Sequence, residues 1–208
     1  ILKKMKLKNN DFFLVTAHRS ENVDNLENLK IIFDALNKIS QKYKKRVIYP
    51  MHPRTSSKLK NLSVPKCIEI IKPLGFFDFT KLEKNALCLI TDSGTVPEEA
   101  LYFKKPCVTI RESTERPETI ESGSNILSGL NSDHIFQCVK QMTSIVPDWS
   151  WNLTLGDGKT ASKVVNIIRG KLERRVIEMW DLLGKNFIKN IMTILVTGGS
   201  GSLGSELQ

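Results

Sequence analysis

One stretch of the chain decides its fold class: Leu87-Cys-Leu-Ile-Thr-Asp-Ser-Gly-Thr-Val-Pro-Glu-Glu-Ala-Leu-Tyr-Phe103. It begins with a short apolar run, turns through Asp92, Ser93 and Gly94, and continues with residues of helical period from Pro97. Proline is favoured in the first turn of a helix because an N–H there has no intrahelical partner. The stretch therefore predicts a buried strand, a tight turn and a helix, in that order.

The same alternation continues on both sides of that stretch. The apolar runs that we predict as strands are residues 12–16, 47–51, 67–71, 87–91, 107–110 and 125–127. The segments that we predict as helices are residues 26–39, 57–62, 79–84, 97–103 and 133–143. Strands that alternate with helices build a parallel sheet covered by helices on both faces. We expect an α/β fold with a doubly wound parallel sheet.

The net charge of +9 over 208 residues raises the question of a nucleic-acid partner. Residues 1–10 carry four Lys and no acid, and residues 159–190 carry eight basic and three acidic side chains. Residues 11–158 together carry only +1. A nucleic-acid surface needs its positive charge on the binding face. We therefore expect no nucleic-acid partner.

Composition limits the class of protein further. The chain is 40% hydrophobic and can bury one core, and no apolar stretch reaches the roughly 18 residues of a membrane-spanning helix. The four Cys stand alone, without the spacing of a metal site, which favours a reducing cytoplasm. The chain begins with Ile1 and shows no secretion signal. We expect a soluble cytoplasmic fragment that binds no metal and no membrane.

Polar side chains follow several of the predicted strands. In a parallel sheet, ligands bind beyond the carboxyl ends of the strands, so these side chains are the candidate site. They are His18, Arg19, Glu21, His52, Arg54, Asp92, Ser93, Gly94, Arg111, Thr114, Glu115 and Arg116. A single His after a strand is usually structural, but two His and several Arg on one edge favour a binding site. Phe76, Phe77 and Phe79 would ordinarily belong to the core.

The turn after residue 91 favours an anion. A helix begins with unpaired N–H groups, which bind phosphate well, and the Ser93 hydroxyl adds a donor. Glu98 and Glu99 could simply stabilise the helix, because negative side chains in its first turn interact favourably with the positive end of the helix dipole. Alternatively, Glu99 could reach past a phosphate to the hydroxyls of a sugar.

Five motifs, in order, resemble the C-terminal domain of the non-hydrolysing UDP-N-acetylglucosamine 2-epimerase family, over residues 11–143. They are Thr16-Ala-His-Arg-Ser-Glu-Asn22, Tyr49-Pro-Met-His-Pro-Arg54, Pro73-Leu-Gly-Phe-Phe-Asp-Phe79, Thr91-Asp-Ser-Gly-Thr-Val-Pro-Glu-Glu99 and Arg111-Glu-Ser-Thr-Glu-Arg-Pro-Glu118. Two of these motifs, Pro73-Leu-Gly-Phe-Phe-Asp-Phe79 and Ser93-Gly-Thr-Val-Pro-Glu-Glu99, are most similar to the branch that forms UDP-N-acetyl-L-fucosamine. The family's commoner motif has Gly-Gly-Val-Gln after the Ser, where this chain has Gly94-Thr-Val-Pro97.

The resemblance implies a Rossmann-like C-terminal half of a two-domain enzyme of the GT-B type. It implies that Ser93 and Gly94 hold the diphosphate, that Glu99 holds the ribose, and that Phe79 stacks on uracil. It further implies that His18 is catalytic. Arg19, His52 and Arg116 would line the substrate cleft.

The resemblance also implies the reaction, which inverts C2 of a UDP-N-acetyl-hexosamine through elimination and re-addition of UDP, without a cofactor. The carboxylates for proton transfer belong to the family's N-terminal domain, so we expect this half to be inactive alone and the complete enzyme to be a homodimer. Two alternatives stay open at this point. The chain could be a non-catalytic UDP-sugar-binding module, or half of a UDP-sugar glycosyltransferase.

The C-terminal tail carries a second signal, Met192-Thr-Ile-Leu-Val-Thr-Gly-Gly-Ser-Gly-Ser-Leu-Gly204. The spacing of Gly198, Gly201 and Gly204 after a β-rich run resembles the NAD(P)-binding start of an extended short-chain dehydrogenase. The chain stops at Gln208, so we expect a vestigial cofactor site that binds no NAD.

We expect four segments along the chain. Residues 1–10 are a basic remnant of an interdomain link, and residues 11–145 form the UDP-binding domain. Residues 146–183 are a loop and a closing basic amphipathic helix. Residues 184–208 are a linker and the truncated NAD(P)-binding start.

Overall fold

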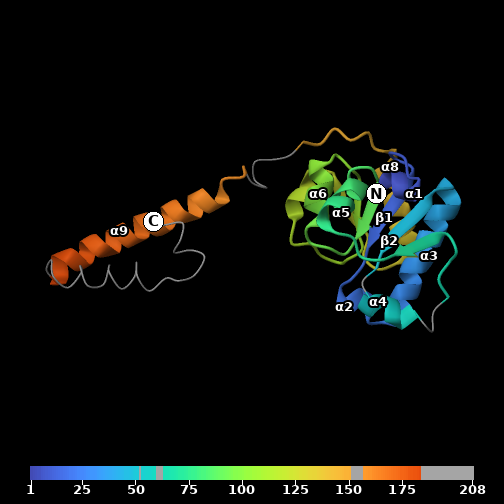
Figure 1. Ribbon diagram of the computed structural model, residues 1–208, viewed down its shortest axis with the longest axis horizontal. Coiled ribbons are helices and arrows are strands. Elements are labelled where there is room, and N and C mark those ends of the chain that lie inside the picture. The colour runs from blue at the N-terminus through green and yellow to red at the C-terminus, as the bar shows by residue number, and fades with distance from the viewer. Residues whose placement is uncertain (52, 60–62, 151–156, 184–208) are drawn as a thin grey trace. The chain divides into compact units, whose positions relative to one another are not determined.

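The computed structural model describes residues 1–51, 53–59, 63–150 and 157–183. The chain divides into two compact units, Ile1–Leu155 and Gly156–Gln208. The first unit contains the sheet and the helices that cover it (Figure 1). The described part of the second unit contains α9 (Thr160–Leu183), the helix expected over those residues. The tail with Gly198, Gly201 and Gly204 lies outside the described residues.

The first unit is built on a six-stranded sheet in the order β3-β2-β1-β4-β5-β6, and all its strand pairs are parallel. The strands are β1 (Phe12–Thr16), β2 (Arg46–Pro50), β3 (Ile68–Ile71), β4 (Cys88–Thr91), β5 (Cys107–Thr109) and β6 (Asn125–Leu127). This confirms the predicted α/β, doubly wound fold. The strand order reverses between β1 and β4, which is where such sheets bind ligands.

The helices of the first unit follow the predicted pattern, with three short additions, α1, α2 and α7. The bounds are α1 (Leu2–Met5), α2 (Ser20–Val23), α3 (Leu26–Tyr43), α4 (Pro53–Lys58), α5 (Phe76–Glu83), α6 (Val96–Tyr102), α7 (Pro117–Glu121) and α8 (Ser132–Ser144). The helix predicted over residues 57–62 begins earlier than expected, because α4 starts at Pro53, a residue suited to a first helical turn, and residues 60–62 lie outside the described residues.

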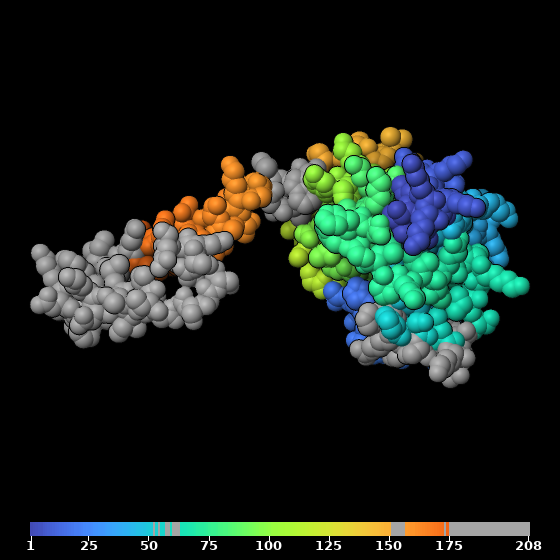
Figure 2. All heavy atoms as spheres, in the orientation of Figure 1, coloured from blue at the N-terminus to red at the C-terminus, as the bar shows by residue number. Residues whose placement is uncertain are grey.

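Successive side chains of each strand point to opposite faces of the sheet, and each face has its own core. Phe13 and Val15 of β1 pack with α3 and α8, whereas Phe12 and Leu14 pack with α1, α5 and α6. Leu7 is buried in the second cluster, so residues 1–10 form part of the packed unit. Figure 2 shows this N-terminal segment in dark blue against the neighbouring green surface.

The expectation of a core role for Phe76 and Phe77 was wrong. Their side chains are 68% and 86% exposed, and their rings contact each other edge to face. They occupy the first turn of α5, directly after Gly75, whereas Phe79 and Leu82 form the buried face of that helix.

Among the described residues, no helix is long and apolar enough to cross a membrane.

Candidate functional site

The carboxyl ends of β1 and β4 are joined by side chains as well as by the sheet ladder. Thr16 and Thr91 are partners in the register, and their Oγ1 atoms lie 2.6 Å apart. Thr91 Oγ1 also accepts a hydrogen bond of 2.9 Å from the N–H of Ser93. The hydroxyl pair therefore ties the end of β1 to the turn that leads into α6.

Asp92 organises the loop after β1. Its side chain is fully buried and accepts hydrogen bonds from the N–H groups of His18 and Arg19, at 3.0 Å each. The Asn22 side-chain amide donates a further bond of 3.0 Å to the same carboxylate. A buried carboxylate is stable only when such donors surround it. Asp92, one of the candidate residues after the fourth predicted strand, thus fixes the backbone on which His18 and Arg19 stand.

His18 faces both the buried carboxylate and the solvent. Its Nδ1 atom lies 3.3 Å from Asp92 Oδ1, and its side chain is 57% exposed. A carboxylate beside Nδ1 favours the tautomer that carries its proton there. The other ring nitrogen, Nε2, is then the acceptor that can take a proton from a ligand.

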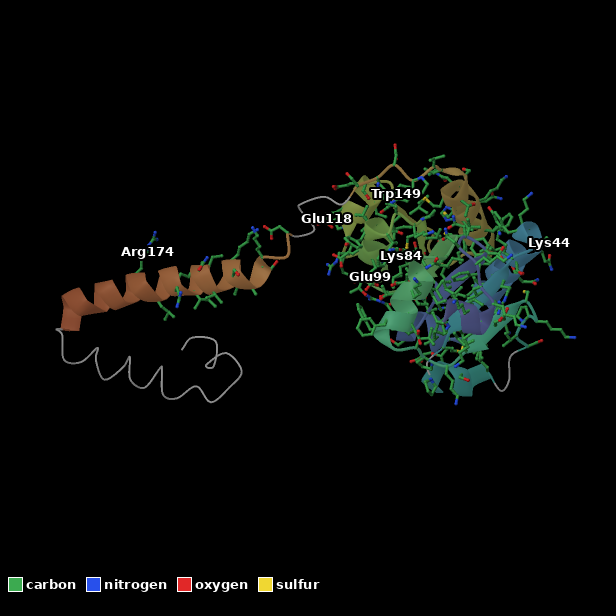
Figure 3. The ribbon with its side chains drawn as sticks, turned by 45° about the horizontal axis from the view of Figure 1, so that its top comes forward. Lys44, Lys84, Glu99, Glu118, Trp149 and Arg174 are labelled. Carbon is green, nitrogen blue, oxygen red and sulfur yellow. The ribbon has the colours of Figure 1, made fainter. Side chains whose placement is uncertain are left out.

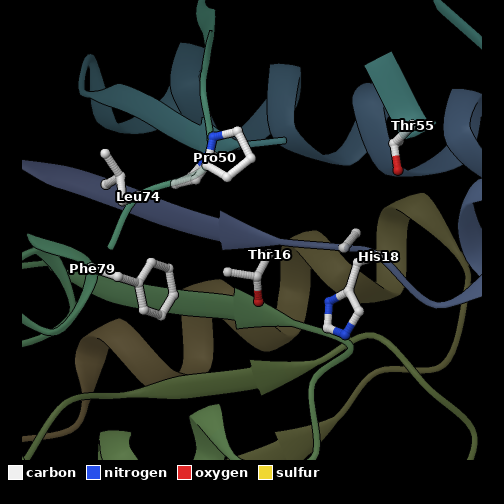
Figure 4. Close-up of a pocket in the computed structure, with 8 residues that line it drawn as sticks. Thr16, His18, Pro50, Thr55, Leu74 and Phe79 are labelled. Carbon is white, nitrogen blue, oxygen red and sulfur yellow. The ribbon is translucent and has the colours of Figure 1, made fainter. Parts of the chain in front are cut away.

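A cavity of about 450 Å³ opens beside His18. It is lined by Thr16, Ala17, His18, Pro50, Thr55, Pro73, Leu74 and Phe79. Figure 4 shows the rings of His18 and Phe79 with Thr16 between them in that view. This volume lies in the usual range for small-molecule sites, and apolar walls with a few polar groups are typical of such sites. The structure therefore brings two predicted site residues from separate elements, His18 and Phe79, to one cavity.

The turn from Ser93 to Thr95 is compact and stays open to a ligand. Ser93 Oγ lies 3.3 Å from Thr95 Oγ1 and 3.3 Å from the N–H of Thr95. A Cβ atom at Gly94 would meet Glu115 Oε2 at 3.6 Å and Arg19 Nη2 at 3.8 Å, which are ordinary contacts. The backbone at Gly94 thus lies directly beside the charged groups after β1 and β5.

Three of the predicted arginines, Arg19, Arg111 and Arg116, are paired with carboxylates. Arg111 donates to both oxygens of Glu115, at 2.7 and 3.0 Å, and this guanidinium lowers the pKa of Glu115 to about 2. Arg19 makes a longer contact with Glu115, at 3.4 Å. Arg116 Nε lies 2.8 Å from Glu98 Oε1. A ligand phosphate would therefore compete with Glu98 and Glu115 for Arg116 and Arg19.

Glu99 lies on α6, half-buried (Figure 3). The carboxyl group of Glu83, at the end of α5, is within hydrogen-bonding reach of it.

His52 lies outside the described residues, so its predicted place in the cleft is untested. Within the described part of the chain, no group of three or more His, Cys, Asp or Glu side chains could hold a metal ion.

Comparison with known proteins identifies relatives of this chain. Residues 1–169 match the sequence model of a family described as UDP-N-acetylglucosamine 2-epimerase. The chain belongs to this family. The resemblance that we drew from the five motifs is thereby confirmed at the level of the family.

Individual members of the epimerase family match over the same part of the chain. A UDP-N-acetylglucosamine 2-epimerase of Methanococcus maripaludis is 45% identical over 170 residues, which are 79% of this chain and 46% of that protein. A UDP-2,3-diacetamido-2,3-dideoxy-D-glucuronate 2-epimerase of Pseudomonas aeruginosa is 38% identical over 129 residues, which are 62% of this chain and 36% of that protein. The chain spans about half the length of the first of these epimerases.

A solved epimerase structure shares the fold. The UDP-GlcNAc 2-epimerase of Methanocaldococcus jannaschii, in complex with UDP-GlcNAc and UDP, superposes with a TM-score of 0.70 at 43% identity. The match covers 77% of this chain and 45% of that one. It supports the expectation that the present fold is one half of a larger epimerase of the GT-B type. The assignment to the fucosamine-forming branch stays a prediction.

Proposed function

We propose that this chain is the nucleotide-binding half of a UDP-N-acetyl-hexosamine 2-epimerase. The observation that carries the proposal is the shared cavity of His18 and Phe79 at the end of β1, where buried Asp92 ties His18 to the Ser93-Gly94 turn. This edge is also the part of the sheet at which the chain order reverses. Relatives of the chain bind UDP-GlcNAc and UDP, which supports the same substrate class here.

The proposed binding mode divides the nucleotide among three groups of residues. Phe79 stacks on uracil inside the cavity, because an aromatic ring offers a flat apolar surface to a base. Ser93 and the backbone beside Gly94 take the diphosphate, and Glu99 accepts hydrogen bonds from the ribose hydroxyls. Since α6 has only seven residues, we assign diphosphate binding to the donor groups of the turn rather than to the helix dipole.

The proposed chemistry begins with removal of the proton on C2 of the sugar. The bond between C1 and the diphosphate oxygen then breaks, and UDP leaves a glycal-like intermediate. Protonation of C2 from the opposite face and re-addition of UDP complete the inversion. Negative charge develops on the diphosphate as its bond breaks, so Arg19, Arg116 and Ser93 stabilise the leaving group.

His18 completes the proposed site from the side of the cavity. With its proton held at Nδ1 beside Asp92, it presents Nε2 to the substrate as a proton acceptor. The remaining acid and base groups would come from the other half of the enzyme, so we propose that this chain binds UDP but does not turn over alone. A cytoplasmic location and a homodimer of the complete enzyme are part of the same proposal.

Calorimetric titration of the chain with UDP tests the nucleotide site. We expect binding that weakens about tenfold in Ser93→Ala and in Glu99→Ala, the loss of one hydrogen bond to a charged group. Glu27→Gln, on the exposed side of α3, is the matched control and should bind like the wild type. Equal affinity in all four proteins would contradict the assignment of Ser93 and Glu99.

The reaction itself is tested with the complete protein in deuterated water. Epimerisation through C2 deprotonation must introduce solvent deuterium at C2, which proton NMR detects as loss of the C2 proton signal. UDP release that requires an acceptor sugar, without exchange at C2, would instead identify a glycosyltransferase. UDP binding with neither exchange nor transfer would leave a non-catalytic binding module.

A further inference from the structure

Glu83, the last residue of α5, is a buried ionisable group that the proposed reaction does not use. Its side chain is fully buried, and neither carboxyl oxygen accepts a hydrogen bond from an N–H or O–H donor among the described residues. Burial of a carboxylate without donors is strongly unfavourable, so such a group demands an explanation. The simplest explanation is that Glu83 carries a proton.

The surroundings of Glu83 support that explanation. The core cluster on this face of the sheet is apolar and includes Leu82, Ala86 and Ala100. Burial, the negative charge of Glu99 and a hydrogen bond with Glu99 together raise the pKa of Glu83 to about 9. Glu83 is therefore neutral at physiological pH.

A protonated Glu83 has one hydrogen to donate, and the carboxylate of Glu99 is an acceptor within its reach. Glu83 and Glu99 stand on separate helices, α5 and α6, that share the cluster on this face of the sheet. Glu99 is half-buried, so one side of its carboxylate can meet Glu83 while the other side meets a ligand. Two carboxyl groups in contact share one proton because both cannot ionise together.

We propose that Glu83 is a positioning residue for the nucleotide, which donates a hydrogen bond to Glu99 and directs the free oxygen of Glu99 toward the ribose hydroxyls. The inference rests on the proposed function, since it takes the ribose role of Glu99 from there. An unsupported Glu side chain must lose its rotamer freedom when it binds a ligand. A partner behind it removes part of that loss in advance, as supporting residues do in other binding sites.

The shared proton is tested directly by carbon NMR. The chain is labelled with glutamate carrying ¹³C at the side-chain carboxyl, and the signal of Glu83 is identified by its absence in Glu83→Gln. We expect this signal to keep its protonated position at pH 7, where the exposed glutamates are ionised. Titration of Glu83 together with the exposed glutamates would overturn the proposal, whether or not the chain binds UDP.

The positioning role is tested by comparing UDP with its 2′,3′-dideoxy analogue in calorimetry. Glu83→Leu removes the donor but keeps an apolar side chain in an apolar site, and we expect about tenfold weaker binding of UDP. Binding of the dideoxy analogue should not change, because that analogue has no ribose hydroxyls for Glu99. Glu83→Gln keeps a neutral donor and should restore most of the UDP affinity.

The outcomes separate this inference from the proposed function. An equal loss for UDP and the dideoxy analogue in Glu83→Leu would assign Glu83 a purely structural role and overturn the proposal. Unchanged UDP binding in that variant would overturn it as well. No UDP binding by the folded wild-type chain would overturn the nucleotide site and the ribose role of Glu99, while the NMR titration would still decide the shared proton.

Discussion

The carboxylate of Asp92 accepts a hydrogen bond of 3.0 Å from the backbone N–H of His18, across 74 residues of sequence. This bond joins the end of β4 to the loop after β1, at the point where the strand order reverses. A single buried residue thereby fixes the position of the proposed catalytic histidine.

Asp92→Asn should loosen that loop. The substitution replaces a charged acceptor by an amide, and its NH₂ group would face N–H donors, so we expect a loss of about 2 kcal/mol in the free energy of unfolding. Denaturant titration measures the loss, and Asp133→Asn is the matched control, because Asp133 is 83% exposed. Equal stability of the two variants would show that the Asp92 contacts do not fix the loop.

Phe79→Leu should weaken UDP binding while the fold stays intact. Base stacking on an aromatic ring contributes about 1–3 kcal/mol, so we expect a loss of tenfold or more in affinity. Phe77→Leu, two residues away and outside the cavity, should bind UDP like the wild type. The pair is measured by calorimetry, and an equal loss in both variants would argue against stacking by Phe79.

Gly94→Ala should separate binding from stability. The added Cβ meets only ordinary contacts of 3.6 and 3.8 Å, so the free energy of unfolding should stay within about 0.5 kcal/mol of the wild type. The same methyl group would stand where the diphosphate approaches the backbone, and UDP affinity should fall. Gly123→Ala should lower the free energy of unfolding and leave UDP affinity unchanged. Gly123 has a φ of +77°, and a side chain there costs about 1–2 kcal/mol. Wild-type UDP affinity in Gly94→Ala would place the diphosphate elsewhere.

Glu83 should make the protein less stable as the pH rises. In the unfolded chain its pKa returns to the ordinary value of 4.5, whereas in the folded state the pKa is about 9. Between these pH values the folded state binds more protons, so the free energy of unfolding falls by up to about 1.4 kcal/mol per pH unit. Glu83→Gln removes this term, and its stability relative to the wild type should increase from pH 5 to pH 8. A difference that does not change with pH would show that Glu83 is not protonated in the fold.

The fold was predictable because its signals are local. Apolar runs of about five residues and helical periods between them gave the strands and most helices, since burial on both faces of a parallel sheet requires such runs. The shift of α4 to Pro53 and the exposure of Phe76 and Phe77 were not predicted. Both depend on where a helix begins, and neighbouring segments decide that as much as the local residues do.

The sequence by itself determined the family and the set of polar residues at the carboxyl edge of the sheet, because the motifs after each strand are contiguous. Only the tertiary structure decided how those residues meet. It placed Asp92 behind His18, brought Phe79 into the same cavity, and set Glu83 against Glu99. Each of these contacts joins separate elements of the fold. Its energy depends on burial and distance, which are set only when the sheet and its helices pack.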